Sequence, residues 1–221
     1  MKKLLFLALI GFGAFKAYQS QDWFKGGGAA AVDKSGKALV ILFTGPDCGD
    51  ACARLAAAIK ERGLDYQVTE LIGPDGAPVK NPYGVKGYPT VVVGKQRIEG
   101  DNLHALTAAL GEAFGKDGLA RRERMAMDDH FDAQGKPKVV LYGTAWCGYC
   151  AKQRELFAAQ NIAFDDVNVE ESETGKFAYA ALQGNGYPLT YVGYRRFSGY
   201  QEGEILAAIS ELSKTHQANV R

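Results

Sequence analysis

The four cysteines are the residues of this chain most able to do chemistry, and they form two close pairs: Cys48 with Cys52, and Cys147 with Cys150. Disulfide frameworks staple distant segments of small secreted domains, so close pairs favour redox chemistry or metal binding. A structural zinc site needs four ligands, which two pairs of thiolates would supply. Because the two spacings differ and the three histidines cluster with neither pair, we expect no metal.

The second pair has the spacing of a redox dithiol, Cys147-Gly148-Tyr149-Cys150. A predicted strand precedes it and a predicted helix follows it. Cys147 should therefore face the unsatisfied N–H groups and the positive dipole end of that helix, which lower a thiol pKa and supply the attacking thiolate. Cys150, one turn further on, is placed to resolve a mixed disulfide, and Gly148 leaves the approach to Cys147 open.

A shift of 99 residues aligns two halves of the chain without a gap, placing Cys48 on Cys147 and Pro89 on Pro188. A proline that ends a loop before a strand is a candidate for a cis peptide bond. Its recurrence at the same distance from a cysteine makes Pro89 and Pro188 cis-proline candidates. The backbone of Tyr187 would then lie beside the sulfurs and hold a substrate backbone by strand-like pairing.

Each half follows the order strand, helix, strand, loop or helix, hairpin, helix, which predicts an α/β fold with a four-stranded mixed sheet flanked by helices. Strands are expected at Ala38–Thr44, Asp65–Leu71, Thr90–Val93, Arg97–Ile98, Lys138–Gly143, Ala163–Val169, Thr190–Val192 and Arg196–Phe197. Helices are expected at about Gly49–Arg62, Leu103–Phe114, Gly148–Gln160, Glu173–Gln183 and Glu202–Ser213. The domains are placed at 29–115 and 137–221. The polar segment 116–136 between them is interpreted as a linker with one helical stretch.

The amino-terminal segment 1–28 is interpreted as a signal-like or membrane-anchor segment with a glycine-rich spacer. Two lysines precede an apolar run at residues 4–15, which is short for a membrane span and typical of a secretory signal. No small-x-small cleavage site follows, so an uncleaved anchor is an alternative. We expect a periplasmic protein, or one anchored in the membrane and facing the periplasm. A buried first helix in a cytoplasmic protein is the other alternative.

The formal net charge of +1 comes with no basic field, so we expect no nucleic-acid partner. Aromatic residues flank the nucleophile. Trp146 and Tyr149 are expected to form a substrate surface, with simple packing as the alternative for Trp146.

The run from Leu141 to Cys150, followed by Tyr187-Pro188 and Gly199-Tyr200, resembles a glutaredoxin within the thioredoxin-like superfamily. The resemblance covers about Pro137–Leu212. It implies a dithiol–disulfide oxidoreductase that binds no cofactor, in a family that often uses glutathione as a co-substrate. Together with the repeat, it implies two tandem thioredoxin-like (glutaredoxin-type) domains. By this resemblance Cys147 is the nucleophile, Cys150 the resolving thiol, and Tyr187, Pro188, Gly199 and Tyr200 line a glutathione groove.

The chain departs from the family where glutathione is held. It has Gly186-Tyr187-Pro188 where many glutaredoxins have Thr-Val-Pro, and no lysine stands shortly before Cys147. Protein disulfides and glutathione both remain as expected partners. Two alternatives stay open: an exported protein-disulfide isomerase or oxidase, and a non-catalytic binding module of the same fold.

The first pair is one residue longer, Cys48-Gly49-Asp50-Ala51-Cys52. Helix positions four apart are about 6 Å from each other, within disulfide range. The neighbouring aspartates should raise the thiol pKa values. We interpret this half as a degenerate copy whose Cys48–Cys52 pair is a redox relay, a structural or regulatory disulfide, or part of a binding module.

Overall fold

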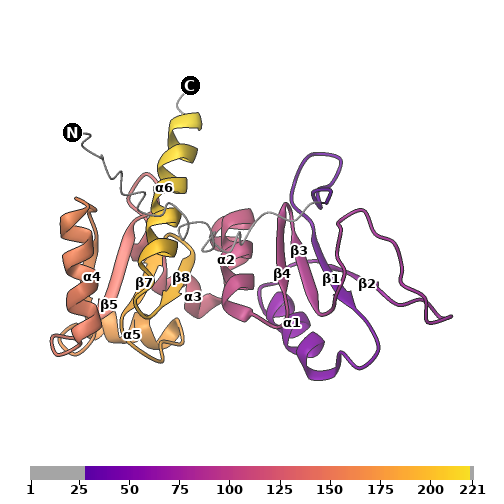
Figure 1. Ribbon diagram of the computed structural model, residues 1–221, viewed down its shortest axis with the longest axis horizontal. Helices are drawn as coiled ribbons and strands as arrows, with labels where there is room; N and C mark the ends of the chain where they lie inside the picture. Colours follow the sequence, from indigo (N-terminus) through magenta and orange to yellow (C-terminus); the bar gives the residue numbers. More distant parts are fainter. Residues whose placement is uncertain (1–27, 220–221) are drawn as a thin grey trace, which may run out of the picture.

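The computed structural model describes residues 28–219, with side chains to Leu212. Two four-stranded mixed sheets lie side by side, with α2 (Leu103–Phe114) and α3 (Arg121–Ala126) between them (Figure 1). The α/β architecture expected from the sequence is thus confirmed as two mixed sheets flanked by helices. The predicted signal or anchor run 4–15 lies outside the described residues. Within residues 28–219 no helix is both long and apolar enough to cross a bilayer.

The first sheet has the strand order β2-β1-β3-β4. Its elements are β1 (Val40–Thr44), α1 (Gly49–Glu61), β2 (Gln67–Glu70), β3 (Thr90–Val93), β4 (Gln96–Glu99) and α2. One face packs on α1 and α2 through Leu42, Leu55 and Leu110. The other face carries Ile41 and Phe43 and is covered by the chain around Leu71 and Val85 rather than by a helix.

The second sheet has the equivalent order β6-β5-β7-β8. Its elements are β5 (Val139–Gly143), α4 (Gly148–Ala159), β6 (Asp165–Asn168), α5 (Glu173–Ala181), β7 (Leu189–Val192), β8 (Arg195–Ser198) and α6 (Glu202–Asn219). Strand alternation sends Leu141 toward Phe157 of α4 and Ile205 of α6, and sends Tyr142 and Leu189 to the opposite face.

The two sheets share their antiparallel register but differ in the parallel one. Val40 pairs with Val93, and Val139 pairs with Val192, as a shift of 99 residues requires. In the parallel ladder, however, Ile41 pairs with Gln67, whereas Val140 pairs with Asp165. The first half therefore has one residue more between its first cysteine and its second strand, so the structure corrects the gapless alignment there.

The segment interpreted as a linker is folded against the second sheet. It forms two 3₁₀ turns, Gly115–Gly118 and Asp128–His130, on either side of α3. Leu119, Ala126 and Met127 join the buried cluster of the second half. This packing ties the segment that follows α2 to the second half.

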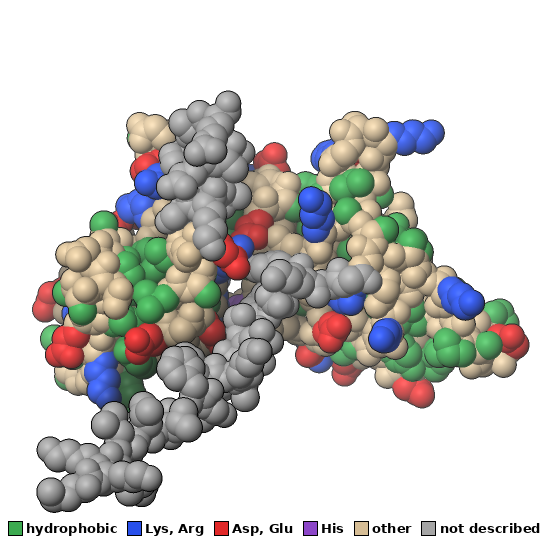
Figure 2. Space-filling model, turned by 45° about the horizontal axis from the view of Figure 1, so that its top comes forward, with side chains coloured by type: hydrophobic (Ala, Val, Ile, Leu, Met, Phe, Trp, Pro, Cys, Tyr) green, Lys and Arg blue, Asp and Glu red, His purple; other side chains and the backbone are tan. Residues whose placement is uncertain are grey.

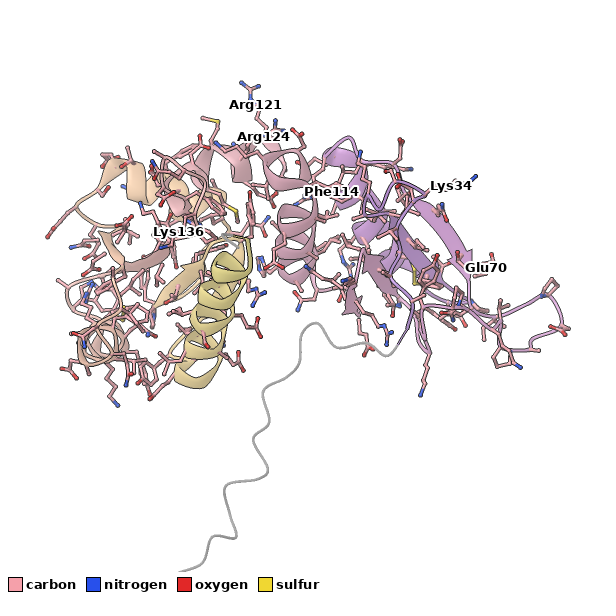
Figure 3. The ribbon with its side chains drawn as sticks, turned by 90° about the horizontal axis from the view of Figure 1, so that it is seen from above. Lys34, Glu70, Phe114, Arg121, Arg124 and Lys136 are labelled. Atoms are coloured by element: carbon pink, nitrogen blue, oxygen red, sulfur yellow. A yellow bond between two sulfur atoms is a disulfide. The ribbon has the colours of Figure 1, made fainter. Side chains whose placement is uncertain are left out.

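Charged contacts also join the halves. Arg62, at the end of α1, donates to both carboxylate oxygens of Glu123 on α3, at 2.6 and 2.7 Å. Arg195 on β8 donates to Glu112 on α2 at 2.7 Å. Phe114 lies at the α2 end between the halves, while Arg121 projects away from the molecule (Figure 3).

Candidate functional site

Cys147 is the N-cap of α4. Its backbone is extended, with φ −76° and ψ 107°, and its Sγ accepts the Cys150 N–H at 3.1 Å. The sulfur thus takes the place of the side-chain oxygen that commonly caps a helix. Cys147 and Cys150 are disulfide-bonded, with Cα atoms 5.2 Å apart. A thiolate on Cys147 would be stabilised by this N–H and by the dipole of α4.

Both cysteines are buried, Cys150 more completely than Cys147. Cys150 is 0% exposed and Cys147 is 7% exposed, whereas the aromatic residues that flank Cys147 are open to solvent. Trp146 is 70% exposed and Tyr149 is 61% exposed. A substrate disulfide arriving from solvent would therefore meet these rings and Cys147 before Cys150.

The Tyr187–Pro188 peptide bond is cis. Leu189, the next residue, pairs with Tyr142, so Pro188 lies at the end of the sheet where β5 leads into the cysteines. The Trp146 and Tyr187 rings meet edge to face with centroids 6.0 Å apart. The segments before Cys147 and before β7 are therefore in contact.

Gly199, the first of the two predicted groove residues Gly199 and Tyr200, is hydrogen-bonded to the same proline. The Gly199 N–H donates to the Pro188 carbonyl at 2.7 Å. The Tyr200 hydroxyl donates to Glu202 at 2.9 Å, and this hydrogen bond raises the Tyr200 pKa. Tyr200 is thus held against a carboxylate at the start of α6, which disfavours an anionic ligand group at that position.

Trp146 and Tyr187 form an aromatic rim beside the cysteines. The two residues that hold this rim in place could not be identified from the sequence. Glu170, after β6, accepts two hydrogen bonds from the Trp146 indole N–H, at 2.9 and 3.1 Å. The Tyr179 hydroxyl accepts the Gly186 N–H at 2.8 Å and donates to the Gly186 carbonyl at 3.0 Å. The Tyr179 ring also stacks on Tyr187, with centroids 5.0 Å apart.

The first cysteine pair has a different geometry. Cys48 and Cys52 are disulfide-bonded with Cα atoms 5.5 Å apart, and the Tyr88–Pro89 peptide bond is cis. Cys48 has helical backbone angles, φ −63° and ψ −31°, and its side chain makes no cap hydrogen bond. The thiolate-stabilising contact of Cys147 is therefore not reproduced at Cys48.

In the first half, the Tyr88 ring lies against the backbone of the turn before Cys48. A Cβ on Gly45 would come within 2.3 Å of that ring, so the ring covers the turn before Cys48. Its counterpart Tyr187 leans on Trp146 instead.

The surroundings of the cysteines offer no metal centre. Among the side chains that the structure describes, no group of three or more His, Cys, Asp or Glu is arranged to hold a metal ion. On the face drawn in Figure 2, acidic and basic side chains are interspersed rather than gathered into a field of one sign.

Comparison with family models finds a match in the second half of the chain. The glutaredoxin family model matches residues 139–193. Two proteins of Mycobacterium tuberculosis, "Putative glutaredoxin MT3292" (strain CDC 1551 / Oshkosh) and "Putative glutaredoxin Rv3198A" (strain ATCC 25618 / H37Rv), are each 30% identical over 46 residues, 21% of this chain and 55% of the relative. The chain thus spans about half the length of the curated relatives it matches.

The solved structures to which this chain is similar include glutaredoxins. A buckwheat glutaredoxin in complex with glutathione is 18% identical, with 43% of this chain and 96% of that chain covered and a TM-score of 0.33. A glutaredoxin of Archaeoglobus fulgidus is 23% identical, with 34% and 89% covered and a TM-score of 0.30. With the family match, the strand order and the position of the cysteines at the start of α4, residues 139–193 are a glutaredoxin-like domain of the glutaredoxin/thioredoxin-like fold.

Proposed function

We propose that this protein is a thiol–disulfide oxidoreductase that works through Cys147 and Cys150. The observation that carries the proposal is the Cys147 Sγ at the start of α4, where it accepts the Cys150 N–H at 3.1 Å. A thiolate at that position is stabilised without any cofactor. The glutaredoxin family match over residues 139–193 supports the same activity.

The exchange takes two steps. The Cys147 thiolate attacks one sulfur of a substrate disulfide, which forms a mixed disulfide and releases the other substrate sulfur as a thiolate that takes up a proton. The Cys150 thiolate then attacks the Cys147 sulfur. The Cys147–Cys150 disulfide forms, the second substrate thiolate leaves, and the substrate has gained two electrons. A thiol donor must reduce the protein disulfide again.

Protein disulfides and glutathione mixed disulfides are the substrates we propose, with glutathione as a co-substrate. The exposed rings of Trp146 and Tyr149 offer a surface to a polypeptide. We expect the backbone of Tyr187, which precedes the cis proline, to pair with an extended substrate. The Glu202 carboxylate, which accepts the hydrogen bond of the Tyr200 hydroxyl, favours a polypeptide substrate over glutathione, which is an anionic tripeptide.

The first half is proposed to be a degenerate copy of the second. Its support is the shared strand order, the shared antiparallel register and a cis peptide bond before Pro89 as before Pro188. Export or anchoring through residues 4–15 is also a proposal, resting on the two lysines and the apolar run. Blotting the mature protein for its size tests cleavage of this segment.

Activity assays on the full chain test the function. Reduction of a protein disulfide and of a glutathione mixed disulfide should both be lost in Cys147→Ser. Cys48→Ser, the equivalent change in the other half, is the matched control and should keep most of the activity. Unchanged activity in Cys147→Ser, or none in the wild-type chain, would contradict the proposal. A reduction potential of about −200 mV would identify a reductase, and one of about −120 mV would favour the alternative of an oxidase.

A further inference from the structure

Arg154 brings a positive charge close to the buried sulfur of Cys150. The two residues are one helical turn apart on α4, so they share a helix face. Both side chains approach the same point, which is the position that a Cβ on Gly143 would occupy. It lies 3.0 Å from the Cys150 Sγ and 3.4 Å from the Arg154 Nη2. The glycine at the end of β5 leaves the space that both groups use.

The guanidinium is held in this place from two sides. Its Nε and Nη2 donate to the carboxylate of Asp166 on β6, at 2.7 and 3.0 Å, and its Nη1 donates to the Thr144 carbonyl at 3.4 Å. The hydrogen bond to Asp166 raises the Arg154 pKa, so the side chain stays charged. Arg154 is 27% exposed and Asp166 is 40% exposed, so the carboxylate is the better hydrated partner.

Cys150 needs such a charge because burial opposes its ionisation. The sulfur is fully buried, and desolvation raises a thiol pKa. Gln153, Thr144 and Thr190 on the surrounding elements are also buried, and each has a side-chain polar atom without a hydrogen-bond partner. These groups are neutral.

The titratable groups of the neighbouring elements differ in sign and position. Arg154 is the cation of α4 at this sulfur. The carboxylates are Asp166 on β6 and Glu170 after it, the latter bonded to Trp146. Tyr142 of β5 points to the opposite face of the sheet, where it contacts His130. The resolving thiol is therefore influenced by one cation and by two carboxylates that are each bonded to another side chain.

The first half provides an internal comparison. Under the shift of 99 residues, Arg154 corresponds to Leu55 and Gly143 to Thr44. Leu55 is fully buried in the apolar core of the first half. The charge and the space for it occur together only in the half with the Cys-x-x-Cys pair.

We propose that Arg154 is a positioning residue for the second step of the exchange, in which its guanidinium stabilises the Cys150 thiolate that attacks the Cys147 mixed disulfide. The inference rests on the proposed function. The bond that forms is Cys147–Cys150, the bond that breaks joins Cys147 to the substrate, and the substrate sulfur leaves as a thiolate. Arg154 exchanges no proton in this step, and it touches no substrate atom.

The test separates the two steps in time. The reduced full chain, with Cys48→Ser and Cys52→Ser in every sample, is mixed with dithiobis(nitrobenzoate) in a stopped-flow instrument. Attack by Cys147 releases a first thionitrobenzoate, and attack by Cys150 releases a second. The pH midpoint of the second phase reports the ionisation of Cys150. Cysteine Cβ chemical shifts of the reduced chain measure the same pKa by NMR.

Arg154→Gln should raise the pH midpoint of the second phase by about one unit and slow that phase about tenfold below the midpoint, since an opposite charge at this range shifts a pKa by one or more units. The first phase should be unchanged. Arg154→Lys should restore most of the rate. Lys152→Gln, which removes a neighbouring cation of α4 that lies over the Tyr149 ring, is the matched control and should change neither phase.

The two hypotheses fail in different ways. A wild-type chain that shows no second phase would contradict the proposed function. A normal second phase in the wild-type chain, with the same pH midpoint and the same NMR pKa in Arg154→Gln, would overturn the role of Arg154 alone.

Discussion

The indole N–H of Trp146 donates to both carboxylate oxygens of Glu170, at 2.9 and 3.1 Å. The ring remains 70% exposed, so this contact orients Trp146 without burying it. Glu170 follows β6 and Trp146 precedes α4, and the contact therefore fixes one wall of the cysteine site to the edge of the sheet.

Glu170→Ala should release the Trp146 ring and lower the turnover of a protein disulfide severalfold, because a mobile ring presents a less ordered surface to a polypeptide. Time-resolved fluorescence anisotropy of Trp146, in a chain with Trp23→Phe, measures the ring motion. Glu171→Ala removes the adjacent exposed carboxylate and is the matched control. Equal ring motion in wild type and Glu170→Ala would show that the carboxylate does not hold the ring.

Tyr179→Phe should loosen the turn that leads to the Tyr187–Pro188 segment. It deletes both hydrogen bonds between the Tyr179 hydroxyl and Gly186 and keeps the ring stacked on Tyr187. At about 1 kcal/mol for each hydrogen bond, the free energy of unfolding should fall by about 1–2 kcal/mol. Urea unfolding measures the loss, and amide hydrogen exchange at Gly186 should speed up. Protection of Gly186 at the wild-type level would rule out this role of the hydroxyl.

Glu123→Ala should lower the free energy of unfolding by about 3–5 kcal/mol, since it leaves the Arg62 guanidinium buried without its carboxylate. The Arg62 side chain is 5% exposed and the Glu123 side chain 17%. Asp128→Ala breaks an exposed ion pair, in which the Asp128 side chain is 57% exposed and the Lys116 side chain 62%, and it should cost far less stability. Equal losses in urea unfolding for the two variants would contradict a buried ionic link between the halves.

His130 should make stability depend on pH below about 6.5. Burial lowers its pKa from 6.5 to about 4, while Tyr142 and the Gly193 carbonyl hold the ring at 2.9 and 3.3 Å. As pH falls from 6.5 to about 4, the unfolded chain binds a proton that the folded chain does not, so the folded state loses stability, by about 3 kcal/mol over this range.

The measurement for His130 is urea unfolding at a series of pH values from neutral to about 4. His130→Phe should be less stable at neutral pH, because the Tyr142 hydroxyl and the Gly193 carbonyl lose their partner. Its stability should fall less steeply with acid than that of the wild type. His104→Phe, at an exposed histidine of the other half, serves as the comparison. An unchanged slope in His130→Phe would contradict a buried neutral ring.

Much of the fold could be predicted because local patterns and repetition agreed. Thr90–Val93 and Leu103–Phe114 form the strand and helix expected of them, and the other elements shift mainly at their ends. The register of β2 could not be predicted, since an exposed strand with little apolar alternation does not specify its own pairing. Packing of the segment 116–136 was also missed, because its few apolar residues, such as Leu119 and Met127, gain their burial only from the second sheet.

The sequence by itself determined the two cysteine pairs, the helix that begins at Cys147 and the prolines that recur in both halves, since residue type and spacing along one element state these directly. Only the tertiary structure decided that Glu170 and Tyr179 hold the aromatic rim and that Asp166 fixes Arg154 beside Cys150. Those partners come from strands and helices distant along the chain, and their contacts depend on how the elements pack. Arg154 is the intermediate case. Its place one turn after Cys150 could be read from the spacing, but its position near the sulfur depends on the space left by Gly143.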